Sequence, residues 1–346
     1  MLETTLKMGG SDIFIIPGSP VMAKVQARLM PLTDDSAPPA YTRTLIEQVY
    51  AFASQRSLEK LLNEGDDDFS FSLKNIGRFR CNAYKQRGTF AAILRVVAFG
   101  LPDPQALHIP KTVMDLTGYR SGMILITGSA GSGKTTTLAC MVDKINHDRM
   151  GHIITIEDPI EYLHPHALSM VSQREIHSDA QSFESALRSS LRQAPDVIML
   201  GEMRDYETIQ TALTASETGH LLLSSLHTVG AATTVDRIID AFPANQQQQV
   251  RVQLSMVLKA VVSQHLVATT DGGLYPAFEI MIVTSAIQSM IRDGKTHQID
   301  NVIYSSAAQG MISMDADLYR LYKQGVISKE NALLYCTNVD AMSRRL

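Results

Sequence analysis

The stretch GMILITGSAGSGKT, residues 122–135, decides the fold of this chain. Its second half, residues 128–135, matches the phosphate-loop pattern GxxxxGK(S/T) at every fixed position. An apolar segment runs directly into the loop and a helical pattern follows from about residue 133, which is the context that the motif requires. The glycines let backbone N–H groups turn toward phosphate oxygens. The stretch therefore predicts a nucleoside-triphosphate site.

The loop also supplies side chains for the triphosphate and its metal. Lys134 is expected to reach the β- and γ-phosphates, and Thr135 to offer its hydroxyl to Mg²⁺. ATP and Mg²⁺ are therefore the expected cofactors. The other nucleotide-binding candidates come from the loop and the start of the helix: Ser129, Ala130, Gly131, Ser132, Gly133 and Thr136.

A nucleoside triphosphatase also needs a carboxylate near the metal and one that activates water. Residues 197–200 (VIML) predict a strand, which we expect beside the strand that enters the loop. It ends at Gly201, which cannot bind Mg²⁺, and at Glu202. Glu202 is the best general-base candidate, although a solvated carboxylate at the start of a helix fits its position equally well.

Two further groups of polar residues follow apolar segments. Residues 152–156 run into Glu157, Asp158 and Glu161, which suit either Mg²⁺ and water or the capping of a surface helix. His220 and His227 bracket the apolar segment between them, and His227 falls near the expected γ-phosphate. A single histidine is more often an ordinary hydrogen-bonded residue, so position alone leaves both readings open.

The hydrophobic pattern changes partway along the chain. The first 98 residues predict an α+β domain, with strands at 11–16, 21–29, 76–84 and 88–98 and a helix over 41–63 that Gly65 closes. Residues 99–110 contain three prolines and form the linker candidate. Residues 111–346 begin with apolar segments that alternate with helices, which predicts an α/β domain with a mostly parallel sheet. From about 230 the pattern is mostly helical, apart from a strand near 275–283.

Composition excludes several classes of protein. The 346 residues are 45% hydrophobic with a net charge of −4, which fits two folded domains and excludes general disorder. The balance of charge gives no basic field, so we expect no nucleic-acid partner. The three cysteines are far apart in sequence, which indicates a reducing compartment rather than a disulfide framework. No apolar run reaches the roughly 20 residues that cross a bilayer, so any membrane role is expected to act through a partner.

Four motifs occur in a fixed order: GSAGSGKT at 128–135, TIEDPIEY at 155–162, GEMRD at 201–205 and TGHLLLSSLHT at 218–228. Together they resemble the Walker A, Asp box, atypical Walker B and His box of the secretion-superfamily hexameric ATPases of type IV pili and type II secretion. Residues 192–220, 76–84 and 310–315 are similar to the pilus-retraction (PilT-type) subgroup. The resemblance covers nearly the whole chain.

This resemblance implies a fold and roles for individual residues. The fold is a RecA-like ATPase domain after a smaller PAS-like N-terminal domain, with a helical part from about 284. The resemblance makes Glu202 the catalytic glutamate and His220 and His227 phosphate or inter-subunit sensors. Metal and water positioning falls to Glu157, Asp158 and Glu161, of which Glu157 is the Mg²⁺ candidate, directly or through water, and Glu161 the strongest candidate for catalysis. In the first domain it implies that three arginines approach the nucleotide: Arg78, Arg80 and Arg95.

The resemblance further implies a cytoplasmic homohexamer that acts on an inner-membrane platform protein, and on pilin only indirectly. The expected function is ATP-driven pilus retraction, which gives twitching motility. Three alternatives stay open: an assembly or secretion ATPase of the same superfamily, a nucleic-acid motor, and an accessory partner that binds ATP but hydrolyses it weakly. One departure stands out, because Gln288 in AIQSMIR (286–292) replaces an arginine of the retraction subgroup.

Overall fold

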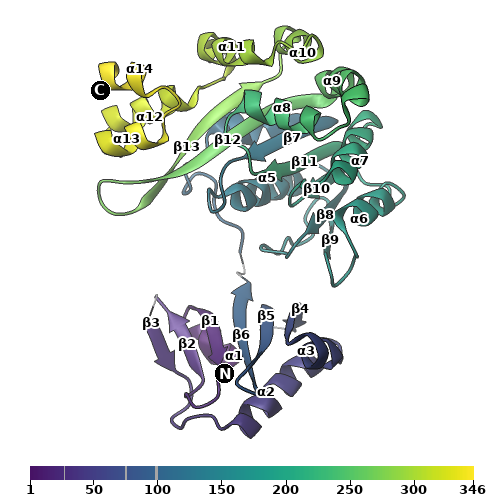
Figure 1. The fold of residues 1–346 in the computed structure, drawn as a ribbon, viewed down its shortest axis with the longest axis vertical. Helices are drawn as coiled ribbons and strands as arrows, with labels where there is room; N and C mark the ends of the chain where they lie inside the picture. Colours follow the sequence, from purple (N-terminus) through teal and green to yellow (C-terminus); the bar gives the residue numbers. More distant parts are fainter. Residues whose placement is uncertain (27, 75, 98–99) are drawn as a thin grey trace. The chain divides into compact units, whose positions relative to one another are not determined.

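The computed structural model describes residues 1–26, 28–74, 76–97 and 100–346, and these form two compact units (Figure 1). The first unit comprises Met1–Gly100 together with Pro159–Leu163, and the second comprises Leu101–Asp158 and His164–Leu346. The predicted end of the first domain at 98 and the first linker residue, 99, lie outside the described residues.

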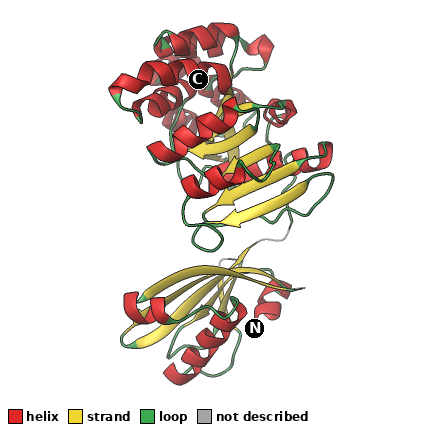
Figure 2. Cartoon of the chain, turned by 90° about the vertical axis from the view of Figure 1, so that its right-hand side faces the viewer, coloured by secondary structure: helices red, strands yellow, loops and turns green. Residues whose placement is uncertain are grey.

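The first unit is built on a six-stranded antiparallel sheet in the order β3-β2-β1-β6-β5-β4. Helices cover one face of this sheet, as Figure 2 shows, and the core between them includes Ile46, Tyr50 and Phe79. Phe69 and Phe71 alternate with polar neighbours along β4, as a half-buried strand requires. Its elements are α1 (Leu2–Lys7), β1 (Gly10–Ile15), β2 (Met22–Val25), β3 (Arg28–Pro31), α2 (Pro39–Phe52), α3 (Glu59–Glu64), β4 (Asp66–Leu73), β5 (Gly77–Gln86) and β6 (Thr89–Val97).

Two predicted elements of this unit are each divided in the structure. The strand predicted over 21–29 is the hairpin β2–β3, because the two halves pair with each other. The helix predicted over 41–63 is interrupted between α2 and α3, where Ser54 and Gln55 have left-handed backbone. Arg56 leaves the helix there to bind Asp67 with two nitrogens at 2.9 Å. The predicted stop at Gly65 is confirmed, with φ of 90°.

The second unit contains a seven-stranded sheet in the order β13-β12-β7-β11-β10-β8-β9, in which only the β12–β13 pair is antiparallel. The predicted mostly parallel α/β sheet is therefore confirmed. Along β7, Met123 and Leu125 belong to the core under α6–α9, while Ile124 and Ile126 belong to the core under α4 and α5. Both faces are buried, as expected for parallel strands.

The bounds of the elements in this sheet layer are as follows: α4 (Lys111–Asp115), β7 (Gly122–Thr127), α5 (Lys134–Asp148), β8 (His152–Glu157), β9 (Met170–Glu175), α6 (Phe183–Ser190), β10 (Val197–Leu200), α7 (Tyr206–Glu217), β11 (Leu221–Leu226), α8 (Ala231–Asp240), α9 (Ala244–Val257), β12 (Leu258–Ala268) and β13 (Leu274–Ile282).

The structure corrects the predicted strand order and two element predictions. The strand 197–200 does not lie beside β7, because β11 lies between them and pairs in parallel with both. Two strands were also missed. One is β9. The other is β12, in a region predicted to be helical, where Ser263, Gln264 and His265 interrupt the apolar run and hide the strand pattern.

The C-terminal part is helical from Ser285, as expected. Figure 1 shows the β12–β13 hairpin extending toward its last helices, whose core includes Met314 and Leu318 packed with Ala277 of β13. Gln288 lies on α10 beside the buried Ile287. No helix among the described residues is long and apolar enough to cross a membrane. These helices are α10 (Ser285–Arg292), α11 (Ile299–Ser305), α12 (Met314–Lys323), α13 (Lys329–Tyr335) and α14 (Val339–Arg345).

Candidate functional site

The phosphate loop joins the carboxyl end of β7 to α5 and depends on its glycines. Gly128, Gly131 and Gly133 have φ of 142°, 76° and 90°, which side chains disfavour. A Cβ on Gly128 would also lie 2.3 Å from the carbonyl oxygen of Gln264, and a Cβ on Gly133 would lie 2.7 Å from its Nε2. The positive φ at both positions and the close backbone of Gln264 at Gly128 therefore require glycine there.

Gln264 of β12 holds this loop from the side. Its Nε2 donates to the carbonyl oxygen of Ser132 at 2.6 Å, and its Oε1 accepts from Thr137 Oγ1 at 2.8 Å. It therefore ties the loop to the first turn of α5. Sequence reasoning missed this residue because it missed β12, and a lone glutamine in an apolar stretch gave no other signal.

Lys134 lies within the loop that it is expected to serve. Its side chain is buried, and Nζ donates to the carbonyl oxygens of Gly128 and Ser129 at 2.9 and 2.8 Å. Burial lowers the pKa of Lys134, while the nearby charge of Glu202 opposes that shift. Ser132 Oγ is buried with no hydrogen-bond partner among the described residues. A cationic donor and an unused hydroxyl inside a glycine cradle fit a phosphate group.

Glu202 and His227 extend this arrangement into a connected chain of side chains. His227 Nδ1 lies 3.4 Å from Lys134 Nζ, and its Nε2 lies 3.1 Å from Glu202 Oε2. Because a protonated lysine only donates, Nδ1 accepts and Nε2–H faces the carboxylate. Arg204 Nη2 contacts Glu202 Oε1 at 2.5 Å. The Glu202 side chain is only 11% exposed, so it is not a solvated carboxylate.

The acidic stretch after β8 divides between interior and surface. Glu157 is buried and accepts from Thr155 Oγ1 at 2.6 Å and from Gln173 Nε2 at 3.3 Å. Asp158 and Glu161 are exposed, and Glu161 lies in the segment that groups with the first unit. Within the described ranges, no three His, Cys, Asp or Glu side chains gather into a metal-binding group.

The other candidates are not brought to the loop within the second unit. His220 precedes β11 at the opposite edge of the sheet, where its Nδ1 lies 3.0 Å from the carbonyl oxygen of Ala215. Six strand residues, or about 20 Å, separate it from His227. Arg78 and Arg80 share one face of β5 in the first unit. Arg95 pairs with Arg80 across β5 and β6, and it binds Asp12 at 2.9 Å.

A cavity of about 300 Å³ adjoins the start of α5. Gly133, Thr136 and Thr137 form one wall, residues 106–109 another, and apolar residues of the β12–β13 hairpin a third. In residues 106–109, the ring of His108 stacks on the ring of Tyr275 of β13, with ring centroids 4.3 Å apart. Its position beside the loop and its apolar lining suit a nucleotide base. Sequence reasoning placed a linker here and did not identify a pocket.

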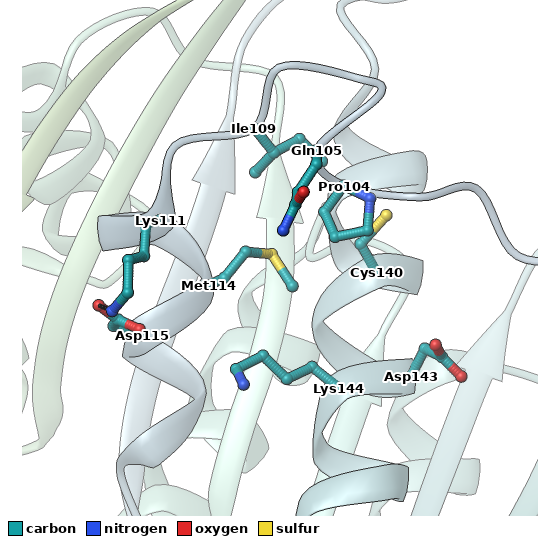
Figure 3. Close-up of a pocket in the computed structure, with 9 residues that line it drawn as sticks. All are labelled: Pro104, Gln105, Ile109, Lys111, Met114, Asp115, Cys140, Asp143 and Lys144. Carbon is teal, nitrogen blue, oxygen red and sulfur yellow. Dashed lines mark hydrogen bonds and ion pairs between the residues drawn. The ribbon is translucent and has the colours of Figure 1, made fainter.

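A larger cavity, of about 530 Å³, lies farther along α5 and contains no phosphate-loop residue (Figure 3). Its lining includes the exposed Lys111 and Asp115, the half-buried Lys144, and the buried Met114 and Cys140. Lys111 is neutralised by Asp115 at 2.6 Å. The larger cavity is therefore not the candidate site, because Gly133 of the phosphate loop lines the smaller cavity and no residue of that loop lines the larger one.

Comparison with known proteins agrees with this site. Residues 66–324 match the family described as "Type II/IV secretion system protein". Two relatives from Pseudomonas aeruginosa are each 40% identical: the type IV pilus ATPase PilU, over 98% of this chain and 88% of its own, and the type IV pilus retraction ATPase PilT, over 96% of both.

Among solved structures, the crystal structure of the pilus retraction motor PilT with bound ADP matches with a TM-score of 0.90 and 42% identity, over 99% of both chains. That protein holds ADP, and this chain has a phosphate loop within a closely similar fold. The chain is thus a nucleotide-binding ATPase. It belongs to the type II/IV secretion system protein family and, within that family, to the PilT/PilU group of type IV pilus ATPases.

Proposed function

We propose that this chain is an ATP-hydrolysing motor that retracts type IV pili and so drives twitching motility. The chemical part of the proposal rests on the Lys134–His227–Glu202 chain at the phosphate loop. The mechanical part rests on the likeness to the retraction motor PilT, which extends over 99% of both chains.

ATP binding exchanges one set of partners of Lys134 for another. Its ammonium now donates to loop carbonyls of Gly128 and Ser129, and the β- and γ-phosphates are stronger acceptors because they are charged. Mg²⁺ supplies charge neutralisation at the phosphates when bound. Hydroxyl and carboxylate oxygens suit it, so Thr135, with Glu157 directly or through water, would hold it.

Glu202 orients the attacking water in this mechanism, and His227 orients Glu202. The Nε2–H of His227 fixes one carboxylate oxygen and Arg204 fixes the other. Because Nδ1 of the same ring faces Lys134, movement of the lysine toward the phosphates changes the contact that holds His227. His227 therefore senses the γ-phosphate, and Asp158 and Glu161 remain candidates for water and metal positioning.

Mechanical work requires more than one subunit. In our proposal the domain of residues 1–98 packs on the ATPase domain, residues 111–346, of the next subunit in a homohexamer, with residues 99–110 as the hinge. Arg78, Arg80 and Arg95 then close over the γ-phosphate, and His220 serves between subunits. Hydrolysis removes the charge that held this closure, so the ring reopens. We place the ring in the cytoplasm, where it turns an inner-membrane platform protein and reaches pilin only through it.

A second candidate is an accessory ATPase of the same machine. The chain is 40% identical both to the retraction ATPase PilT and to PilU, a type IV pilus ATPase whose description names no retraction role, so the similarity does not single out retraction. Gly201 also stands where many such ATPases have a second acid. An accessory ATPase would bind ATP with the same loop but would leave retraction to a partner motor.

Counting pili distinguishes these functions. The gene is deleted in its own host, and surface pili are counted by electron microscopy after complementation with wild type, Lys134→Ala or the control Lys144→Ala, which is on the same helix outside the loop. A retraction motor gives excess pili and no twitching, rescued by wild type and Lys144→Ala only. Bald cells would instead identify an assembly ATPase. An unchanged pilus count would favour the accessory role.

A further inference from the structure

Residues 227–230 connect β11 to α8 and are called the His227 loop below. The start of α8, directly after this loop, is hydrogen-bonded to β12 and β13. Gly230, its N-cap residue, provides no capping side chain. Instead, the N–H of Gly230 donates to Ser263 Oγ at 3.0 Å and the N–H of Ala231 donates to Glu279 Oε1 at 2.7 Å. Two consecutive amides at the end of the loop are thus fixed by β12 and β13, so these strands set where the loop ends.

Glu279 is an unusual residue to find in that position. It is 6% exposed, and it pairs across the sheet with Ser263, which in turn pairs with Thr127, the last residue before the phosphate loop. Burial raises its pKa, and Asp300 adds to the shift, while the Ala231 amide opposes it. A buried carboxylate is costly unless hydrogen bonds compensate. The Ala231 amide therefore stabilises the Glu279 carboxylate, and the carboxylate in turn fixes the position of that amide.

The same carboxylate also reaches the C-terminal helices. The backbone N–H of Met314, the first residue of α12, faces Glu279 closely enough to lower the pKa of that carboxyl. Next to this contact, Ile280 and Ile312 exchange two backbone hydrogen bonds of 2.8 and 3.1 Å, which fasten the segment before α12 to β13. Glu279 thus accepts from the end of the His227 loop, and it lies next to the Ile280–Ile312 contact that fastens the segment before α12.

We propose that Glu279 is a positioning residue that couples the C-terminal helices to the His227 loop. A shift of α12 would move Met314, and through Glu279 it would move Ala231 and the loop before it. This coupling rests on the proposed function of His227 for its effect on turnover, but not for its effect on loop structure.

The test distinguishes the contact of Glu279 with the start of α12 from its contact with the start of α8. Met314→Pro removes the N–H that reaches Glu279, and proline is tolerated at the first position of a helix. Met314→Ala is the matched control, because it also loses the buried side chain but keeps the N–H. Glu279→Ala cuts both sides. In each full-length protein, kcat and KM for ATP are measured, together with hydrogen exchange of the amides of residues 228–235.

We expect Met314→Pro to raise exchange in 228–235 at least about threefold above Met314→Ala, although Met314 is remote in sequence from that segment. Glu279→Ala is expected to raise it more and to lower kcat about tenfold with KM nearly unchanged, because the phosphate loop is intact. Equal exchange in Met314→Pro and Met314→Ala would overturn the coupling. Raised exchange with unchanged kcat would retain the coupling and remove His227 from catalysis.

Discussion

Two histidines bracket the same strand of the parallel sheet and have different environments. His227, after β11, contacts Lys134 and Glu202. The imidazole of His220, before β11, instead lies against Thr218 and Ala215 at the end of α7, at the opposite edge of the sheet. Every residue of the strand between them is buried, so burial does not distinguish its two ends. The direction of the strand distinguishes them. The carboxyl ends of the parallel strands meet at the edge of the sheet that carries the phosphate loop, so a residue that follows a strand lies near this loop.

The difference between the two edges of the parallel sheet is tested most strongly at Glu202. This residue follows β10 at the edge that carries the phosphate loop, which we call the loop edge. Glu202→Gln keeps the shape of the side chain and removes the charge that orients water. We expect kcat to fall by about 10³ with ATP affinity retained, within the usual range for loss of a general base. Steady-state ATPase assays check this, with Glu207→Gln on the exposed side of α7 as control. Turnover within a factor of a few of wild type would remove Glu202 from that role.

The two histidines are next in size of effect. His227→Ala leaves Glu202 with Arg204 alone, and misplacement of a catalytic group costs about 10² in kcat. His220→Ala is expected to leave turnover of dilute, dissociated protein unchanged, because the residue lies at the other edge. Both variants are assayed over a range of protein concentrations. If His220→Ala lowers kcat only where the protein assembles, the inter-subunit role is supported; an equal loss at every concentration would break the comparison between edges.

Sequence alone was sufficient for the residues that motifs carry and insufficient for those that the sheet brings in. The loop, Glu202 and His227 could be predicted, because each follows an apolar strand at a fixed spacing. Strand order could not, and Val197–Leu200 was placed beside β7 where β11 lies. Neighbours in a sheet are set by long-range packing, which leaves no local signature. For the same reason Gln264 was missed: it acts across the sheet, from β12.

Gln264 gives a third, smaller effect on the loop edge. Gln264→Leu keeps the bulk of the side chain and removes its hydrogen bonds to Ser132 and Thr137. At about 1 kcal/mol for each of the two bonds, KM for ATP is expected to rise about thirtyfold, with less change in kcat. Gln249→Leu, on the exposed side of α9, is the control. A wild-type KM would mean that the glycine backbone alone keeps the loop in shape.

The antiparallel sheet of the first unit offers the smallest effect on turnover. Its buried Asp67 accepts from Tyr50 and from two nitrogens of Arg56. Burial by itself would raise the pKa of Asp67, but the hydrogen bonds and charge of Arg56 lower it below the usual value of 3.8. A lowered pKa means that the ionised form stabilises the fold. That stabilisation is fully present above about pH 4 and is lost as the pH falls through the lower, folded-state value.

Asp67→Asn should therefore lower the free energy of unfolding of this unit by about 2 kcal/mol at pH 7, as expected for hydrogen bonds to a charged group. The difference from wild type should shrink as the pH falls below 4, because the carboxyl is then protonated first in the unfolded chain and, at its lower pKa, in the folded protein. ATPase kcat at pH 7 should not change. Urea unfolding followed by hydrogen exchange of residues 66–86 measures this, with the exposed neighbour Asp68→Asn as control. A deficit that persists undiminished at pH 3 would mean that the shape of the Asp67 side chain, not its charge, holds this region. The antiparallel sheet would then contribute packing alone, whereas the loop edge of the parallel sheet depends on charge.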